Sequence, residues 1–167
     1  SQVNGVVPYA IAPNLAHQVV VNGPTGSASG EVVVAAAQPG VFTADQSGGG
    51  QAIAVHGSNP LLLANSETPI APGDVLVIYA EGLGPVNPAS PAGQAAPADP
   101  LSRTTLPVTV TIGGVNAPVS FAGLTPGLTG LYQINVTVPQ GVPIGNSVPV
   151  VVTAGGQLSP VVTIAIR

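Results

Sequence analysis

The side chains best suited to nucleophilic chemistry in this sequence are His56, Ser58 and Asp74. A serine nucleophile needs an imidazole base beside it and a carboxylate that orients the imidazole. The Gly-x-Ser-x-Gly turn that presents such a serine in many hydrolases is absent from the sequence. We therefore expect no catalytic residues. His56 is expected to lie at a strand end, and Asp74, after Pro72-Gly73, to accept hydrogen bonds from turn amides.

Histidine and glycine offer no cofactor or metal site by their spacing. His17 and His56 are far apart in the sequence and have no supporting cluster, so a zinc site is not predicted. His17 is expected to open a strand and to be hydrogen-bonded or solvent-facing. The run Ser47–Gly50 lacks the lysine and the following helix of a phosphate loop, and it predicts a flexible turn.

The carboxylates are scattered along the chain. Asp74 and Glu81 stand at opposite ends of one predicted strand, too far apart for the carboxylate pair of a glycosidase. Asp45, Glu67 and Asp99 could supply a loop calcium site together with backbone carbonyls, although no calcium-loop motif accompanies them. The sequence thus leaves loop calcium as an open alternative and predicts no metal ligand or cofactor.

Two features bear on carbohydrate. Asn135-Val136-Thr137 is a glycosylation sequon, which we interpret as a plain surface pair. Tyr9, Tyr79 and Tyr132 do not cluster in the sequence, so an aromatic sugar-binding platform has little support. Core packing of the tyrosines, similar to a tyrosine corner, is the favoured expectation.

Charge is the most unusual property of the chain. Arg103 and Arg167 are the two basic residues, there is no lysine, and six acidic residues bring the net charge to −4. A basic stripe for nucleic acid or for an anionic membrane surface cannot be built from two arginines. Charged residues make up 5% of the chain, against roughly a quarter in ordinary domains. A surface so poor in charge repels its copies weakly, which favours self-association or cover by a partner.

Composition predicts an all-β protein. The chain of 167 residues has 22 glycines and 19 prolines, which leave little room for long helices. Hydrophobic residues make up 45% and aromatic residues 3%, so the core must consist of Val, Ile, Leu and Ala. No apolar run is long enough for a membrane span, and membrane insertion is not predicted.

Cysteine and methionine are both absent. Disulfides and thiolate metal sites are therefore impossible, although this does not fix the compartment. Because the sequence opens with Ser1 rather than methionine, we expect that its N-terminus arises by processing, excision or design.

Alternating hydrophobic patterns place the strands. Strands are predicted near residues 2–8, 17–22, 31–37, 51–56, 74–80, 108–112, 117–122, 132–138, 148–153 and 161–166. Gly113-Gly114 is expected to join 108–112 and 117–122 as a hairpin, and Ala154-Gly155-Gly156 to join 148–153 and 161–166. The run 74–80 is apolar on both faces and predicts a central strand. Residues 84–100 form a loop rich in proline and alanine.

An internal repeat links the two ends of the chain. Residues 2–8 match 133–139, residues 19–21 match 150–152, and Ser29 with residues 32–35 matches Ser159 with residues 162–165 after a one-residue slip. The identities include glutamine, asparagine and proline as well as valine. The second copy ends a domain that begins near residue 66, whereas the first copy is only the back half of such a domain.

Several segments resemble a known domain family. The run 71–84, followed by 110–117 and by 136–141, resembles an IPT/TIG immunoglobulin-like domain. The whole chain also resembles the Solibacter-type C-terminal domain of large secreted acidobacterial proteins. The segments that carry this second resemblance are 2–4 with 7–9, 39–43, 78–84, 122–127 and 130–133. The resemblance implies secretion, a β-sandwich fold and no catalytic residues. It is weakest at 55–63, where the family commonly has a polar turn and this sequence has a different, largely apolar stretch.

The sequence therefore predicts an all-β, immunoglobulin-like β-sandwich of the IPT/TIG kind over residues 66–167, with an N-terminal β half-domain in residues 1–65. A half-domain leaves strand edges without neighbours. Residues 39–65, an upstream domain or another subunit could supply those neighbours. We expect a non-catalytic, extracellular or cell-surface structural module that pairs with copies of itself in a fibre or coat. The alternative is an accessory domain that binds polysaccharide or a cell surface.

Overall fold

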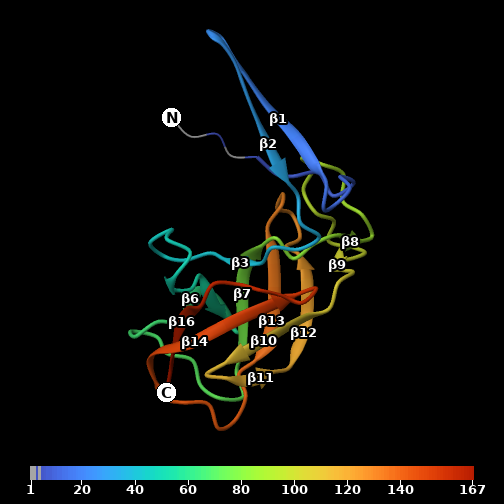
Figure 1. Ribbon diagram of the computed structural model, residues 1–167. Helices are drawn as coiled ribbons and strands as arrows, with labels where there is room; N and C mark the ends of the chain where they lie inside the picture. Colours follow the sequence, from blue (N-terminus) through green and yellow to red (C-terminus); the bar gives the residue numbers. More distant parts are fainter. Residues whose placement is uncertain (1–2, 4) are drawn as a thin grey trace.

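The computed structural model describes Val3 and residues 5–167, and this part of the chain consists of strands and loops (Figure 1). The strands are β1 (Ala16–Gly23), β2 (Gly26–Val33), β3 (Gly40–Val41), β4 (Gly50–Gln51), β5 (Ala54–His56), β6 (Asn59–Leu63), β7 (Val75–Glu81), β8 (Val86–Asn87), β9 (Arg103–Thr104), β10 (Val108–Ile112), β11 (Val115–Ala117), β12 (Val119–Leu124), β13 (Tyr132–Thr137), β14 (Gly145–Ala154), β15 (Gln157–Leu158) and β16 (Val162–Ile166). The predicted all-β class is confirmed. Within the described residues there is no helix that could cross a membrane.

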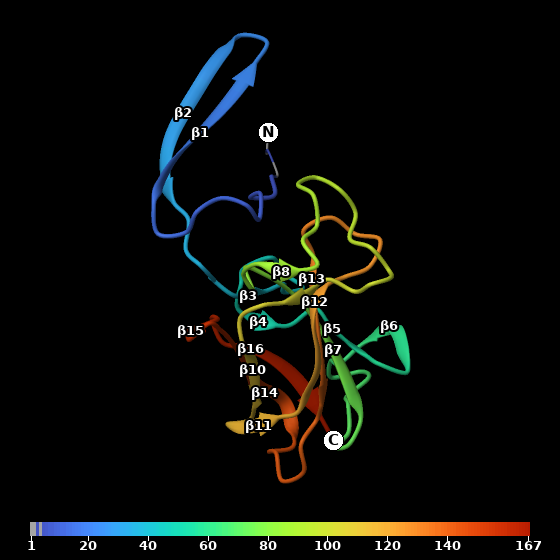
Figure 2. The ribbon, with the colours of Figure 1, turned by 90° about the vertical axis from the view of Figure 1, so that its right-hand side faces the viewer.

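The strands form two large sheets and one separate hairpin. Sheet 1 has the order β11-β10-β14-β16-β4, with β15 paired to β14. Sheet 2 has the order β6-β5-β7-β13-β12-β9-β8, with β3 paired to β7. These two sheets pack face to face as a β-sandwich, whereas β1 and β2 pair only with each other and project away from it (Figures 1 and 2).

Alternation along the strands builds the core between the two sheets. Ile78 of β7 and Ile134 of β13 point inward from sheet 2, and both are fully buried. Val150 of β14 and Ile164 of β16 face them from sheet 1 and are also fully buried. Branched aliphatic side chains fill a pleated surface closely, which is how a core so poor in aromatic residues packs. The predicted central position of residues 74–80 is confirmed, because β7 lies between β5 and β13.

The predicted hairpin of residues 108–112 and 117–122 is only partly correct. β11 pairs with β10 as expected, from Ile112 opposite Val115 to Val110 opposite Ala117. The chain then leaves sheet 1 at Pro118, and β12 pairs with β13 in sheet 2. Proline has no amide hydrogen for a ladder bond, so the strand ends there and the chain can change sheets.

The predicted pairing of residues 148–153 with 161–166 is confirmed. Val148 lies opposite Ile164 and Val150 lies opposite Val162. Gly155 and Gly156 form the tight turn, but this turn leads first into the short strand β15. Both glycines have positive φ, 55° and 85°, as a two-residue hairpin loop with the right twist requires.

The N-terminal predictions need more correction. Gln2 and Asn4 lie outside the described residues, and Val3 and residues 5–8 form no strand, so the strand expected near 2–8 is wrong. This stretch contains Gly5 and Pro8 and has no neighbouring strand to bond with. The strand expected at 31–37 begins earlier, at Gly26, and ends at Val33.

Residues 40–65 belong to the sandwich rather than to the N-terminal hairpin. β3 and β5 pair with β7 in sheet 2, and β4 pairs in parallel with β16 in sheet 1. Residues 39–65 therefore do not supply the missing neighbours of β1 and β2. The strands predicted for residues 1–65 divide between the hairpin and the sandwich.

Candidate interaction surfaces

The hairpin β1–β2, here called the arm, is a regular ladder outside the sandwich. Its register runs from Ala16 opposite Val33 to Gly23 opposite Gly26. At the base, the Asn14 amide donates to the Val34 carbonyl oxygen at 2.7 Å. A two-stranded hairpin without a third strand or a covering layer is only marginally stable in water. The arm is thus a well-formed element that lacks its packing partner among the described residues.

The two faces of the arm differ in chemistry. One face carries His17, Val19, Val21, Ala28, Gly30 and Val32, and the other carries Ala16, Gln18, Val20, Asn22, Ser27, Ser29, Glu31 and Val33. The first, called the apolar face, leaves Val19 48%, Val21 45% and Val32 43% exposed. Alternation of this kind is typical of a strand pair with one face on a core.

The internal repeat identifies what the apolar face resembles. Val19, Val21 and Val32 correspond to Val150, Val152 and Val162, all of which are 0% exposed between the two sheets. The hairpin turns also correspond: Gly23 lies opposite Gly26 in the arm, as Ala154 lies opposite Gln157 in the sandwich. The arm therefore has the pattern of a buried hairpin, but its apolar face is exposed.

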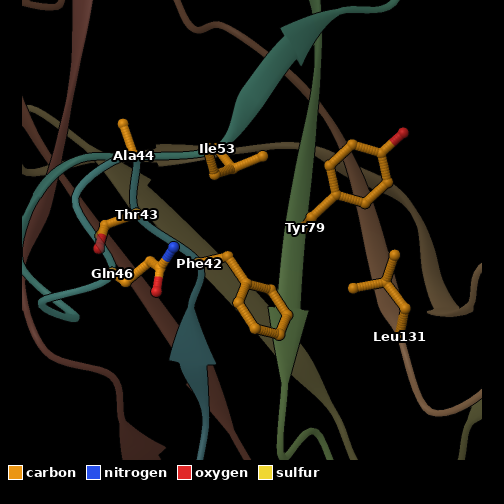
Figure 3. Close-up of a pocket in the computed structure, with 7 residues that line it drawn as sticks. All are labelled: Phe42, Thr43, Ala44, Gln46, Ile53, Tyr79 and Leu131. Carbon is orange, nitrogen blue, oxygen red and sulfur yellow. The ribbon is translucent and has the colours of Figure 1, made fainter.

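The outer face of sheet 2 has a shallow hollow of about 420 Å³ near β5 and β7 (Figure 3). Its floor is held by backbone bonds, since the Phe42 amide donates to the Tyr79 oxygen at 3.1 Å and the Ile53 amide donates to the Phe42 oxygen at 2.7 Å. The rings of Phe42 and Tyr79 flank β7, and Leu131 lies on the Tyr79 side (Figure 3). Phe42 is 41% exposed, so the hollow is an open apolar surface.

A second hollow, of about 320 Å³, lies on the same outer face near β9 and β12. Leu101, Phe121 and Pro126 contribute apolar atoms to it. The Arg103 guanidinium lies over the Phe121 ring, 4.9 Å from its centroid, in a cation–π contact. Gln133 belongs to this wall and donates to the Asn135 side-chain oxygen at 2.8 Å.

The outer face of sheet 1 carries several threonines and no aromatic side chain among the residues paired here. Thr109 lies opposite Thr153, and Thr111 lies opposite Val151. Thr163 continues this face on β16, opposite the exposed Pro149. The outer face of sheet 1 therefore presents threonine hydroxyls beside Val151 and the exposed Leu158, whereas sheet 2 presents aromatic and aliphatic side chains around two hollows.

The residues weighed for nucleophilic chemistry have structural roles. His56 ends β5, as predicted, and its Nε2 lies 2.9 Å from the Thr68 carbonyl oxygen. Asp74 accepts a hydrogen bond from the Ala71 amide at 3.2 Å, which confirms the predicted turn. Among the described residues, no hydrogen bond joins His56 to Ser58 or Asp74. His17 is the second residue of β1, and its Nε2 lies 2.8 Å from the Ala12 oxygen.

The acidic residues are not gathered into a site. Asp45 accepts hydrogen bonds from the Ser47 hydroxyl at 2.8 Å and from the Ser47 amide at 3.1 Å, and these bonds lower the pKa of the Asp45 carboxyl below its usual value. Glu67 and Asp99 are exposed in separate loops. The part of the chain that the structure describes contains no group of three His, Cys, Asp or Glu side chains placed to hold a metal ion.

The tyrosines divide between core and surface. Tyr132 donates from its hydroxyl to the Gly84 carbonyl oxygen, and its ring meets Tyr9 edge to face with centroids 6.4 Å apart. Burial, and then the neighbouring Tyr9, raise the pKa of Tyr132 well above its ordinary value. Core packing is confirmed for this pair, whereas Tyr79 lies on the outer face. No local pattern indicates that Tyr79 lies beside Phe42, because their adjacency depends on the pairing of β3 with β7.

Comparison of the chain with protein-family models, with curated proteins and with solved structures returned no match. The arm and the outer faces of the sandwich are the surfaces from which a function can be inferred.

Proposed function

We propose that the chain is a non-catalytic, extracellular structural module that associates with copies of itself through the arm and forms a fibre or a surface coat. The observation that carries this proposal is the arm: two eight-residue strands with free outer edges and an exposed apolar face. Free strand edges are a template for pairing with another chain. Covering the apolar face removes valine side chains from water, and this stabilises the contact.

The edges of the sandwich offer much less for strand pairing. Its outermost strands β4, β6, β8 and β11 are two, five, two and three residues long. Pro60 interrupts β6 and removes one of its amide donors. Short or proline-bearing edges discourage association, so the arm is the expected contact element.

The same proposal includes the family and the compartment. The resemblance of residues 71–84 to an IPT/TIG immunoglobulin-like domain, and of the whole chain to the Solibacter-type C-terminal domain, supports a secreted protein. A sandwich of mainly antiparallel sheets is compatible with that family. A surface with eight charged residues in 167, two basic and six acidic, favours close packing of copies.

The assembly state of the full chain tests the proposal. Sedimentation velocity and negative-stain electron microscopy over rising concentration are expected to show elongated polymers. The triple variant Val19→Ser/Val21→Ser/Val32→Ser should stay monomeric with an unchanged sandwich. The control Val20→Ser/Val33→Ser, on the opposite face of the arm, should still polymerise. Dispersed monomers of the unmodified chain at high concentration would contradict self-assembly.

A second candidate function is polysaccharide binding by the outer face of sheet 2. The observation that favours it is the open hollow between Phe42 and Tyr79, since sugar rings stack on accessible aromatic side chains. Retention on an insoluble or cell-wall polysaccharide column, lost in Tyr79→Ala, would support this candidate. Failure of the chain to bind any such column would remove it.

A further inference from the structure

The second hollow on the outer face of sheet 2 differs from the first because it brings polar side chains together. Besides its apolar wall, it is lined by Arg103, Ser120, Gln133 and Asn135. These side chains offer both donors and acceptors of hydrogen bonds, and no carboxylate is among the lining residues. The hollow therefore has donors for an anionic ligand and no anion of its own.

Arg103 is positioned by the aromatic ring beneath it. Its guanidinium lies over the Phe121 ring, 4.9 Å from the centroid, and Phe121 is itself only 8% exposed. Gly123 makes room for this ring, because a Cβ atom at Gly123 would lie 2.8 Å from the Phe121 Cζ atom. A stacked guanidinium still has N–H groups along its edge, and two of them match the two oxygens of a carboxylate. Arg103 is exposed, so a ligand in solvent can reach that edge.

The amide side chains beside Arg103 are held next to each other. The Gln133 Nε2 donates to the Asn135 Oδ1 at 2.8 Å, and the Ser120 hydroxyl donates to the Asn135 backbone oxygen at 3.2 Å. These bonds use neither the Gln133 side-chain oxygen nor the Asn135 amino group. One acceptor and one donor side by side suit the neighbouring hydroxyl groups of a sugar ring. Leu101 and Pro126 supply apolar atoms for the carbon skeleton of such a ring.

The two hollows are adjacent on one face. Tyr79 of the first hollow is paired directly with Gln133 of the second hollow, and paired residues point to the same side of a sheet. The row continues from Gln133 through Gly123 to Arg103. Three strand spacings separate β7 from β9, which amounts to about 14 Å. A ligand of a few linked sugar rings can therefore contact the open aromatic hollow and Arg103 together.

The charges around the hollows favour an anion at Arg103. The chain has two basic residues, Arg103 and Arg167, and Arg167 follows β16 of sheet 1. Glu81 lies on the outer face of sheet 2, two residues after Tyr79 on β7. Its side chain lies against Gly40, where a Cβ atom would be 3.4 Å from the Glu81 Oε1, and it lines neither hollow. Arg103 is thus the basic group that an anionic ligand meets on this face.

We infer that the second hollow is a subsite for a hexuronic acid residue of an acidic polysaccharide. The sugar carboxylate binds the Arg103 guanidinium, and the sugar hydroxyls bind Gln133 and Asn135. Neighbouring rings of the same polysaccharide extend over Tyr79 in the first hollow. The inference rests on the second candidate function, polysaccharide binding, and adds a ligand class and a second subsite to it. It does not involve the arm, so a failure of self-association leaves it standing.

Short oligogalacturonides and their fully methyl-esterified forms are matched probes, because the ester removes the charge and keeps the sugar chain. Isothermal titration calorimetry of the full chain is expected to show at least about tenfold tighter binding of the free acid, as for a hydrogen bond to a charged group. Arg103→Gln should remove this preference and leave the affinity for the ester unchanged. Arg167→Gln is the control with the same change of net charge, and it should keep the preference.

A second variant tests the geometry of the guanidinium rather than its charge. Arg103→Lys keeps a cation beside Phe121 and lacks the planar pair of donors, so it should lose most of the preference for the free acid. Urea unfolding of each variant, compared with the unmodified chain, shows that the sandwich is intact.

The possible outcomes separate the subsite from polysaccharide binding in general. Equal affinity for acid and ester, or equal losses in Arg103→Gln and Arg167→Gln, would overturn the inference. Displacement of the oligogalacturonide by equimolar inorganic phosphate would show a plain anion site and would also overturn it. If the chain binds neutral polysaccharide through Tyr79 without preference for the acid, the inference fails and the second candidate function survives. If the chain binds no polysaccharide at all, both fail.

Discussion

The arm and the β14–β16 hairpin carry one sequence pattern in two environments. Val19 and Val150 occupy the same position of the repeat, and the first is 48% exposed while the second is fully buried. β14 has β10 on one side and β16 on the other, together with a covering sheet, whereas β1 has only β2. The comparison teaches that local pattern is enough to specify the hairpin, while burial of its valines depends on what the rest of the molecule supplies.

The sharpest way to break this comparison is to place a charge at the matched positions. Val150→Asp should prevent folding, because an unpaired carboxylate between the sheets costs several kcal/mol. Val19→Asp should change the free energy of unfolding of the monomer by less than about 0.5 kcal/mol. Urea unfolding followed by far-ultraviolet circular dichroism measures both. Equal losses would mean that the arm packs on its own sandwich.

One glycine of the sandwich and one glycine of the arm extend this comparison to the backbone. Gly82 has φ of 71°, its carbonyl accepts from the Gln38 amide at 2.8 Å, and a Cβ atom there would overlap the Gln38 oxygen. Gly82→Ala should therefore lower the free energy of unfolding by at least about 2 kcal/mol. Gly30 in the arm has open space around it, so Gly30→Ala should change the free energy of unfolding by no more than about 0.5 kcal/mol. Thermal unfolding of both variants at low concentration compares them, and a large loss in Gly30→Ala would contradict an uncovered arm.

Tyr132 gives the sandwich a dependence on pH that the arm lacks. Its pKa is raised in the folded state above the ordinary 10.0, so the neutral phenol is the form that folding favours. The contribution of Tyr132 to the free energy of unfolding is fully present below pH 10. It decreases as the pH rises above 10, by up to about 1.4 kcal/mol per pH unit. Tyr132→Phe should reduce this alkaline loss and cost about 1–3 kcal/mol at neutral pH, since the Gly84 oxygen loses its donor. Tyr79→Phe is the control, and an unchanged alkaline loss in Tyr132→Phe would exclude this cause.

Hydrogen exchange measures the smallest expected difference between the arm and the sandwich, which lies in the protection of their backbone amides. In the monomer, amides of residues 16–33 should exchange with less than about tenfold protection, because opening a lone hairpin costs little free energy. Amides of β7 and β13 should exchange far more slowly, through global unfolding. Assembly should protect the arm selectively. Strong protection of the arm in dilute monomer would show a partner within the same chain.

Much of the sandwich was predictable because its signals are local. The alternation of Tyr132, Ile134 and Val136, and the glycine pair at 155–156, specify strands and a turn without reference to distant residues. The strand expected near 2–8 failed because alternating residues extend as a strand only beside a bonding neighbour. Pro118 was visible in the sequence, but its role as a crossing between sheets required knowing both partners of the strands around it.

By itself, the sequence determined the all-β class, the strand near residues 17–22 and the near absence of charge, since composition and the two-residue period of strands act locally. Only the tertiary structure decided which valines are covered, that residues 40–65 join the sandwich, and that Phe42, Tyr79 and Phe121 share the outer face of sheet 2. The physical reason is that strand pairing joins residues distant in the chain, and the edge that each strand leaves free is a property of the whole sheet rather than of any segment.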